Sequence, residues 1–196
     1  CSIPDQPMGE FWTGGIGSIN RTVVESARKY GKRIVGAEAF TGRPEISHYT
    51  EDPEFLKKSA DGSFVSGANR LFLHHWVHQP FDDRYQPGMG MGWWGTHFGR
   101  NQTWLEPGKE FMRYLTRCQM LLQQGDMIGN GDNWIHRRSD AADIFFVINH
   151  TEETRVTSIS SEDTGISPEF WDPYKAVITT VESSSDGSLC TVELIL

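Results

Sequence analysis

Two glutamates lie in short apolar segments that have the composition of buried strands. Glu10 belongs to Met8-Gly-Glu-Phe-Trp12, and Glu38 belongs to Gly36-Ala-Glu-Ala-Phe-Thr41. Burying an isolated ion is costly, so a carboxylate in such a segment is expected to be paired, neutral or functional. Cleavage of a glycosidic bond uses two carboxyl groups, one as the acid for the leaving oxygen and one as base or nucleophile. Glu10 and Glu38 have the residue type for that role; structural carboxylates bonded to backbone or arginine are the alternative.

Three histidines follow the next apolar segment of the chain. His74, His75 and His78 come directly after Leu71-Phe-Leu73. Imidazole can both donate and accept hydrogen bonds, which suits the hydroxyl groups of a sugar. A transition-metal site and plain loop packing are the alternatives, although no His-Glu-x-x-His motif occurs.

Residues 77–105 form a long segment rich in glycine, tryptophan and histidine. A connection of this length in a compact domain is usually functional or mobile. Trp93 and Trp94 are expected either to stack on a sugar ring or to pack the segment, whereas Trp104 favours packing. Arg100 is a candidate for the lining of a binding pocket.

The elements that position these residues alternate between strands and helices. This alternation, over residues 1–125, predicts an α/β fold of β/α units on a parallel sheet. In β/α barrels the active site lies at the carboxyl ends of the strands, where the candidate residues above are found. The expected elements are a helix over 18–30, a strand over 33–40, a helix beginning at Asp52-Pro53, a strand over 71–76 and a helix from about Pro107 to Gly125. In the second helix Phe55, Leu56 and Phe64 are expected to face inward. In the third helix one apolar stripe is expected to contain Phe111, Tyr114, Leu115, Cys118, Leu121 and Leu122.

The pattern changes after Gly125. Residues 126–133 are polar and glycine-rich, which indicates a linker, and residues 134–196 show a periodicity of two. We therefore expect a small antiparallel, β-sandwich-like domain over 134–196. Its expected strands are 144–148, 155–159, 176–181 and 189–196.

Composition excludes several classes of function. The net charge is −8, and the 18 lysines and arginines form no basic stripe, which argues against nucleic acid as a partner. No apolar run is long enough to span a membrane. Cys1, Cys118 and Cys190 lack the spacing of a zinc site or a disulfide framework, so buried or incidental thiols are expected. The chain begins at Cys1 as if inside a domain, which indicates a fragment.

Taken together, the motifs resemble glycoside hydrolase family 106, the α-L-rhamnosidases. The resemblance covers most of residues 5–173. The last three motifs are similar to the start of the β-sandwich that follows the catalytic module in that family. In chain order the motifs are Asp5-Gln-Pro-Met-Gly-Glu-Phe-Trp12, Ala37-Glu-Ala-Phe-Thr41, Gly67-Ala-Asn-Arg70, His74 with His78-Gln-Pro80, Pro87-Gly-Met89, Gly99-Arg-Asn-Gln-Thr-Trp104, Ile135-His-Arg-Arg138, Asp143-Ile-Phe-Phe-Val-Ile-Asn149 and Phe170-Trp-Asp-Pro173.

The resemblance implies a bacterial enzyme, periplasmic or extracellular, that removes terminal α-L-rhamnose from plant glycans or glycosides with inversion. It also implies a calcium ion that holds sugar hydroxyls and would take oxygen ligands. Glu10 matches the family's strand-end glutamate, a general acid or base, and Glu38 would be its partner or a sugar or calcium ligand. The residues expected around the sugar are His74, His75, His78, Trp93, Trp94 and Arg100.

The implied fold is the C-terminal part of a (β/α)₈ TIM-type barrel over 1–125, followed by the β-sandwich. A complete barrel needs about 250 residues, so the missing remainder of the barrel is an expected partner. One essential carboxylate is expected to lie upstream of this chain. A non-catalytic carbohydrate-binding remnant, or an inactive fragment, is therefore the alternative to an active glycosidase.

Overall fold

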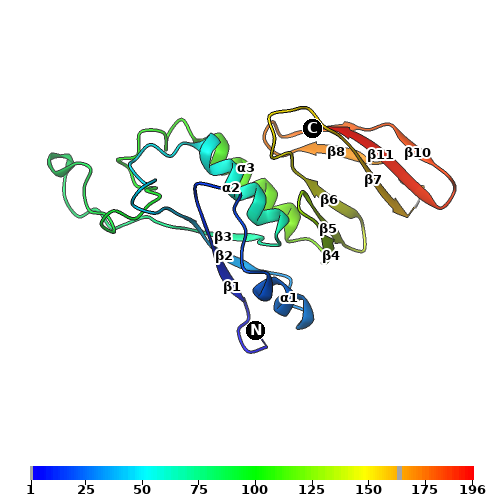
Figure 1. The fold of residues 1–196 in the computed structure, drawn as a ribbon, viewed down its shortest axis with the longest axis horizontal. Coiled ribbons are helices and arrows are strands. Elements are labelled where there is room, and N and C mark those ends of the chain that lie inside the picture. The colour runs from blue at the N-terminus through cyan, green and yellow to red at the C-terminus, as the bar shows by residue number, and fades with distance from the viewer. Residues whose placement is uncertain (1, 163–164) are drawn as a thin grey trace. The chain divides into compact units, whose positions relative to one another are not determined.

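The computed structural model describes residues 2–162 and 165–196 (Figure 1). The chain divides into two compact units, Cys1–Val147 and Ile148–Leu196. Every candidate residue named above lies in the first unit.

A three-stranded parallel sheet organises the first unit. Its order is β1 (Met8–Trp12), β2 (Gly36–Thr41) and β3 (Arg70–Leu73). Helix α1 (Arg21–Lys29) joins β1 to β2, and α2 (Pro53–Val65) joins β2 to β3 (Figure 1). The mixed α/β character and the order of elements predicted for this region are confirmed.

A side-chain cap begins each helix, at the predicted Asp52 for α2, whereas α1 begins at Arg21 rather than at residue 18. The Asn20 side chain accepts a backbone N–H at 2.8 Å at the start of α1, and the Asp52 side chain does so at 2.8 Å at the start of α2. Leu56 is fully buried as expected. Phe55 was predicted to face inward and is instead 36% exposed, because adjacent helical residues point about 100° apart and Leu56 takes the inward direction.

A long segment leads from β3 to helix α3 (Lys109–Leu122) and contains one short 3₁₀ helix, η1 (Asp83–Tyr85). Gly125, with a φ of +59°, follows the helix in the left-handed conformation that glycine tolerates. The predicted apolar stripe is confirmed except for Leu121, which is only half-buried; its buried members are Phe111, Tyr114, Leu115, Cys118 and Leu122.

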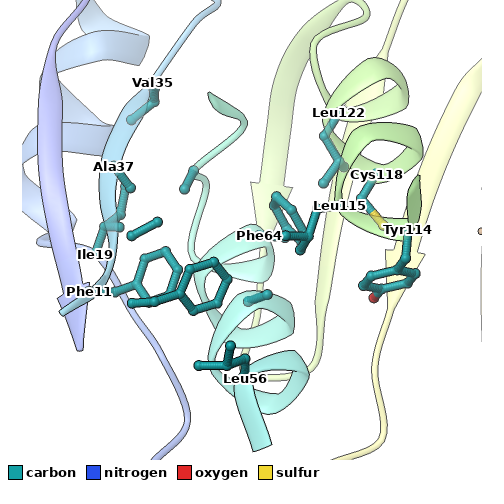
Figure 2. Close-up of a cluster of buried hydrophobic side chains, with 14 of the residues drawn as sticks. Phe11, Ile19, Val35, Ala37, Leu56, Phe64, Tyr114, Leu115, Cys118 and Leu122 are labelled. Atoms are coloured by element: carbon teal, nitrogen blue, oxygen red, sulfur yellow. The ribbon is translucent and has the colours of Figure 1, made fainter. Parts of the chain in front are cut away.

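One hydrophobic core joins the parallel sheet to α2 and α3. Figure 2 shows side chains from β1, β2 and both helices converging on this cluster. Phe64 on α2 is completely buried, as predicted, and lies with Leu115 and Leu122 of α3 in the cluster. Substituting such a side chain by alanine typically costs about 3–5 kcal/mol.

A second sheet of the first unit consists of β4 (Asp126–Asn130), β5 (Trp134–Arg138) and β6 (Asp143–Val147), paired antiparallel. Its side chains complete the core. Ile135 is 1% exposed, and the ring of Phe146 meets that of Phe64 edge-on at 5.9 Å.

The domain boundaries therefore differ from the predicted ones. Residues 126–133, expected to be a linker, contain β4, and the division between units falls after Val147 rather than before residue 134. The physical reason is packing at long range, because Ile135 of β5 is buried in the core cluster with side chains of α2 and α3, and Phe146 of β6 packs partly against it. Alternation with a period of two reveals a strand but not the partner that covers it.

The second unit consists of antiparallel strands, as predicted. Strands β10, β11 and β7 form one sheet, and β8 and β9 form a hairpin. A β-sandwich extending across this region stays a prediction. The strands are β7 (Val156–Glu162), β8 (Glu169–Asp172), β9 (Val177–Thr180), β10 (Ser183–Ser185) and β11 (Leu189–Ile195).

Cys118 and Cys190 are free thiols, in agreement with the prediction, and Cys118 is buried. Cys1 lies outside the described residues. Within 2–162 and 165–196, no helix has the length and apolar character needed to cross a membrane.

The Asn69 side chain ties together three segments of the first unit. Its amide oxygen accepts the Val35 N–H at 2.8 Å, and its amide nitrogen donates to the carbonyls of Arg33 at 2.7 Å and Leu122 at 3.0 Å. The Asn69 carbonyl in turn accepts the Gln123 side chain at 2.7 Å. One residue, 1% exposed, therefore joins the entry to β2, the entry to β3 and the end of α3.

We expect Asn69→Leu to lower the free energy of unfolding by about 3 kcal/mol or more, because three buried backbone groups lose their partners while the volume is kept. Urea denaturation followed by circular dichroism measures this change. Gln124→Ala, at an exposed side chain near the same helix end, is the control and should change stability by less than about 0.5 kcal/mol. A loss below about 1 kcal/mol for Asn69→Leu would contradict a role as a structural tie.

Candidate active site

Glu10 and Glu38 lie directly opposite each other on neighbouring parallel strands. The register of β1 and β2 pairs Glu10 with Glu38, and the alternation of burial places Phe11 and Ala37 in the core. In-register residues of parallel strands point to the same face, with backbones about 4.8 Å apart. The two carboxylates therefore share the face of the sheet that is turned away from the core.

An irregularity in β2 lies two residues after Glu38. The pairing of β1 with β2 skips Phe40, so Trp12 lies opposite Thr41. Phe40 has a φ of +71°, an uncommon conformation for a residue that is not glycine, and its ring is completely buried against Phe11 at 5.0 Å. Bulges of this kind redirect side chains and are enriched beside active sites.

The bulge gives Glu38 polar neighbours. The Thr41 hydroxyl donates to Glu38 Oε1 at 3.0 Å, and His74 Nε2 lies 3.8 Å from the same oxygen. Glu10 has a different partner, because its Oε1 accepts the indole N–H of Trp12 at 3.2 Å. The Glu38 side chain remains 43% exposed, so both carboxylates are reachable from outside.

The backbone fixes the orientation of two of the predicted histidines. His74 Nδ1 lies 2.7 Å from the Gly95 carbonyl, and His75 Nε2 lies 2.9 Å from the Trp94 carbonyl. A carbonyl only accepts, so each of these ring nitrogens must carry the proton and donate. His74 Nε2 is thereby directed toward Glu38, and His75 Nδ1 is a buried atom with no partner.

Backbone bonds between residues far apart in the sequence hold these histidines in place. Gly42 and Gly95 exchange hydrogen bonds of 2.6 and 3.1 Å, and the Thr96 N–H donates to the Phe40 carbonyl at 3.0 Å. A β-carbon at Gly95 would lie 2.5 Å from the Ser47 hydroxyl oxygen, so the crossing requires glycine there. We call this contact the Gly42–Gly95 crossing.

The tryptophans separate into two groups. Trp94 meets Trp12 edge-on at 5.6 Å and is 39% exposed, whereas Trp93 is 80% exposed. Trp104 packs against the core, as predicted. Trp12 therefore links Trp94 to Glu10, and Trp94 is the better placed of the two to contact a ligand at the carboxylates.

Two predicted site residues lie on the long segment after β3 without a shown contact to the carboxylates. Arg100 donates to the carbonyls of Gln79 at 3.3 Å and Phe81 at 2.5 Å, so its guanidinium stabilises the segment itself. His78 is exposed. The structure brings Glu10, Glu38, His74, His75 and Trp94 together, and the roles of all the predicted site residues stay predictions.

Sequence reasoning overlooked a buried glutamate beside the crossing. Glu51 is 2% exposed, and neither of its carboxylate oxygens has a hydrogen-bond partner among the described residues. An ideal β-carbon at Gly95 would lie 3.0 Å from Glu51 Oε1, which places this carboxylate at the crossing. In the part of the chain that the structure describes, the buried polar atoms without partners also include the hydroxyls of Thr13, Ser47 and Thr96 and the Nδ1 of His97.

No local signal in the sequence identifies Glu51. It directly precedes the Asp52-Pro53 pair that begins α2, and the sequence analysis assigned the acidic character there to Asp52 as the helix cap. The burial of Glu51 comes from the segment around Gly95, more than forty residues away in the chain. An unpaired carboxylate kept at such a place is costly and is therefore a candidate functional residue.

His97 is the second overlooked residue. It is 7% exposed, and its ring stacks on Tyr49 with centroids 4.0 Å apart. Burial lowers the pKa of His97, the nearby His75 and His74 lower it further, and Glu51 acts in the opposite direction. The Tyr49 pKa is raised, first by burial and then by the charge of Glu51.

A small pocket opens beside this stack. Tyr49, His75 and His97 line one part of it, and Gln79 and Asn101 line another. Gln79 joins two parts of the segment that follows β3, since its side chain accepts the Met89 N–H at 2.8 Å. The pocket thus adjoins His75 and provides polar and aromatic walls, the chemistry that a sugar ring requires.

The comparison with known families now decides the affiliation of the chain. The family model described as alpha-L-rhamnosidase, glycoside hydrolase family 106, matches residues 2–130. The chain belongs to this family. The matched region contains both glutamates and every other candidate site residue.

Two individual proteins are similar to the family 106 chain. A protein of Formosa agariphila named "Putative beta-glucuronidase" is 40% identical over 128 residues, which are 64% of this chain and 11% of that protein. The structure of a rhamnosidase from Novosphingobium sp. PP1Y matches 100% of this chain and 34% of its own, with a TM-score of 0.88 and 16% identity. The second likeness concerns the fold, and this chain spans a minor part of both relatives.

We expect Glu51→Gln to raise the free energy of unfolding at neutral pH by about 1–3 kcal/mol, because it removes a buried charge that has no partner and keeps the shape. Urea denaturation measures the change. Glu54→Gln, at an exposed residue one helical turn away, is the matched control and should have an effect within about 0.5 kcal/mol. Destabilisation by Glu51→Gln would show that the carboxylate is stabilising after all.

We expect the stability of the chain to fall as the pH is lowered below about 6.5, the pKa of histidine in an unfolded chain. The pKa of His97 is lower in the folded chain, so as the pH falls the unfolded chain is protonated before the folded one. The free energy of unfolding therefore decreases until the pH is below the folded pKa and then levels off. His97→Gln should reduce this slope by up to about 1.4 kcal/mol per pH unit. Urea midpoints between pH 5 and 8 test this, with exposed His48→Gln as the control; an unchanged slope in the His97 variant would refute it.

Proposed function

We propose that this chain forms part of the catalytic module of a glycoside hydrolase that removes terminal α-L-rhamnose from plant glycans or glycosides with inversion. In this proposal residues 1–125 belong to a partial (β/α)₈ barrel completed by chain outside these residues, and the protein works in the bacterial periplasm or outside the cell. Membership of family 106 supports the reaction class.

One observation carries the proposal. Glu10 and Glu38 lie in register on adjacent parallel strands, on one face and open to solvent, with His74 and Trp94 beside them. A structural pair would be expected to have its oxygens satisfied by arginine or backbone groups. Here one oxygen of each carboxylate accepts a hydrogen bond from a neighbouring side chain, and within residues 2–162 and 165–196 no hydrogen bond is found for the other oxygen.

In the proposed reaction water attacks the anomeric carbon while the bond from that carbon to the leaving oxygen breaks. One carboxylic acid gives its proton to the leaving oxygen, and the other carboxylate takes a proton from the water. His74, held by the Gly95 carbonyl, would bond sugar hydroxyls or support Glu38. Trp94 would offer its exposed face to the sugar ring, and His75, His78, Trp93 and Arg100 complete the proposed binding residues.

A calcium ion is implied by the family, and the described residues do not fit one on their own. Calcium takes six to eight oxygen ligands, usually including several carboxylates. In the part of the chain that the structure describes, no group of three or more His, Cys, Asp or Glu side chains is placed to share an ion. Calcium therefore stays a prediction that requires oxygen ligands beyond Glu10 and Glu38, and no step above depends on it.

A carbohydrate-binding remnant without catalysis is the second candidate. The observation that favours it is length, since the chain covers 34% of the similar rhamnosidase structure and 11% of the similar protein named as a glucuronidase. If the second essential carboxylate lies outside this chain, the exposed Trp93 and Trp94 and the histidines would bind sugar without cleaving it.

The deciding experiment measures sugar release by the chain from an aryl α-L-rhamnoside, with and without calcium, together with a binding titration of free rhamnose. An aryl β-D-glucuronide is the second substrate, because the similar protein from Formosa agariphila carries a glucuronidase name. We expect Glu10→Gln and Glu38→Gln each to lower kcat by about 10²–10⁴-fold with the fold intact, the usual share of acid–base catalysis.

Glu152→Gln, at an exposed residue of the second unit, is the matched control and should retain full activity. Rhamnose binding without release would support the remnant. The absence of both binding and release would reject both functions for this chain. Near-normal kcat in Glu10→Gln would remove Glu10 from the mechanism.

A further inference from the structure

A second cavity of the first unit lies at the amino-terminal ends of two of the parallel strands. Its lining includes Val35, directly before β2, and Gly67, shortly before β3, and contains neither Glu10 nor Glu38. The empty volume, open solvent included, is about 710 Å³. Nothing in the proposed glycosidase reaction uses this cavity.

The cavity concentrates positive charge on a protein that is strongly acidic. Four of its lining residues are cationic, namely Arg28, Lys32, Arg33 and Arg137, and one, Asp126, is acidic, so the lining carries a net charge of three positive units. The whole chain has a net charge of −8. Such a local reversal of sign attracts anions and raises their concentration at the cavity.

The cations have few partners within the protein. Arg33 Nε pairs with Asp126 at 2.8 Å, which accounts for the one carboxylate of the lining. For Arg28 and Lys32 no ion pair is found among the described residues. Two flexible cationic side chains at the rim are therefore free to close on a ligand.

Arg137 supplies a fixed donor in the wall. It is 3% exposed, and its Nε and Nη2 donate to the carbonyls of Gln124 at 2.9 Å and Gly125 at 2.7 Å. Among the described residues, no hydrogen-bond partner is found for its third nitrogen, Nη1. Burial lowers the pKa of Arg137, an effect that Asp126 opposes and Arg33 reinforces, so a bound anion would be stabilising there.

The floor of the cavity is apolar. Val24 and Val35 are each 5% exposed, and Met127 packs partly against the core. A ligand that combines an oxyanion with a small apolar body would satisfy both the cationic rim and this floor.

We propose that this cavity, lined by Arg28, Lys32, Arg33 and Arg137, is a binding site for a small oxyanion, a carboxylate, sulfate or phosphate group, with room for an apolar body. The arginines offer the planar pairs of donors that match two oxygens of such a group.

The test is isothermal titration of the 196-residue chain at constant ionic strength with inorganic phosphate, inorganic sulfate, benzoate and benzyl alcohol. Benzoate and benzyl alcohol differ in the charged group and share the ring, so the comparison isolates the oxyanion. We expect saturable binding of at least one of the three anions and none of benzyl alcohol. Tighter binding of benzoate assigns the site to organic acids, and tighter binding of phosphate or sulfate assigns it to inorganic oxyanions.

The double variant Arg28→Gln/Lys32→Gln should weaken binding by about tenfold, since each exposed charge contributes modestly. Arg21→Gln/Lys29→Gln is the matched control, because it removes two charges from α1, the helix that carries Arg28, at positions outside the cavity lining. Circular dichroism and the urea midpoint verify folding, and Arg28→Gln alone serves if the double variant unfolds. The proposal fails if no anion saturates, if benzyl alcohol binds as well as benzoate, or if both double variants weaken binding equally.

Discussion

The buried amide of Asn69 is the constraint on which the candidate site depends. Parallel strands are not neighbours in sequence, so something must fix how far along each strand its partner begins. Asn69 does this by bonding the backbone of Arg33 and Val35, just before β2, and that of Leu122 at the end of α3. A slip of one residue would turn Glu38 into the core and Ala37 outward, because side chains alternate between faces.

The site is then assembled by departures from regular structure. The bulge at Phe40 ends the regular register of β1 and β2 after Ala39, and the Gly42–Gly95 crossing anchors the segment that follows β3. These features place a threonine hydroxyl and an imidazole near a carboxylate from the neighbouring part of the chain. Irregular backbone of this kind costs stability and persists where the surrounding packing determines it, which here is the cluster of Phe11, Phe40 and Phe98.

Those features of the fold that depend on neighbours in sequence could be predicted, and those that depend on distant packing could not. The caps at Asn20 and Asp52 and the stripe of α3 follow from local spacing, and the meeting of Glu10 with Glu38 follows from parallel strands. The burial of Glu51 and the attachment of β4–β6 to the first unit arise from residues far away in the chain. The spacing of residue types along the sequence gives no signal for either feature. The catalytic roles themselves stay predictions.

Unpaired polar atoms gather around the crossing to an extent that folding alone does not explain. Buried polar groups in native proteins are nearly always hydrogen-bonded, and each exception costs on the order of 1–3 kcal/mol. Here the hydroxyls of Ser47 and Thr96, both oxygens of Glu51 and a ring nitrogen of His97 lack partners within the protein. Selection for stability alone would favour apolar residues at these positions. Polar groups beside the carboxylate pair instead fit a site whose hydrogen bonds are completed by water or by substrate, which is consistent with the proposed function.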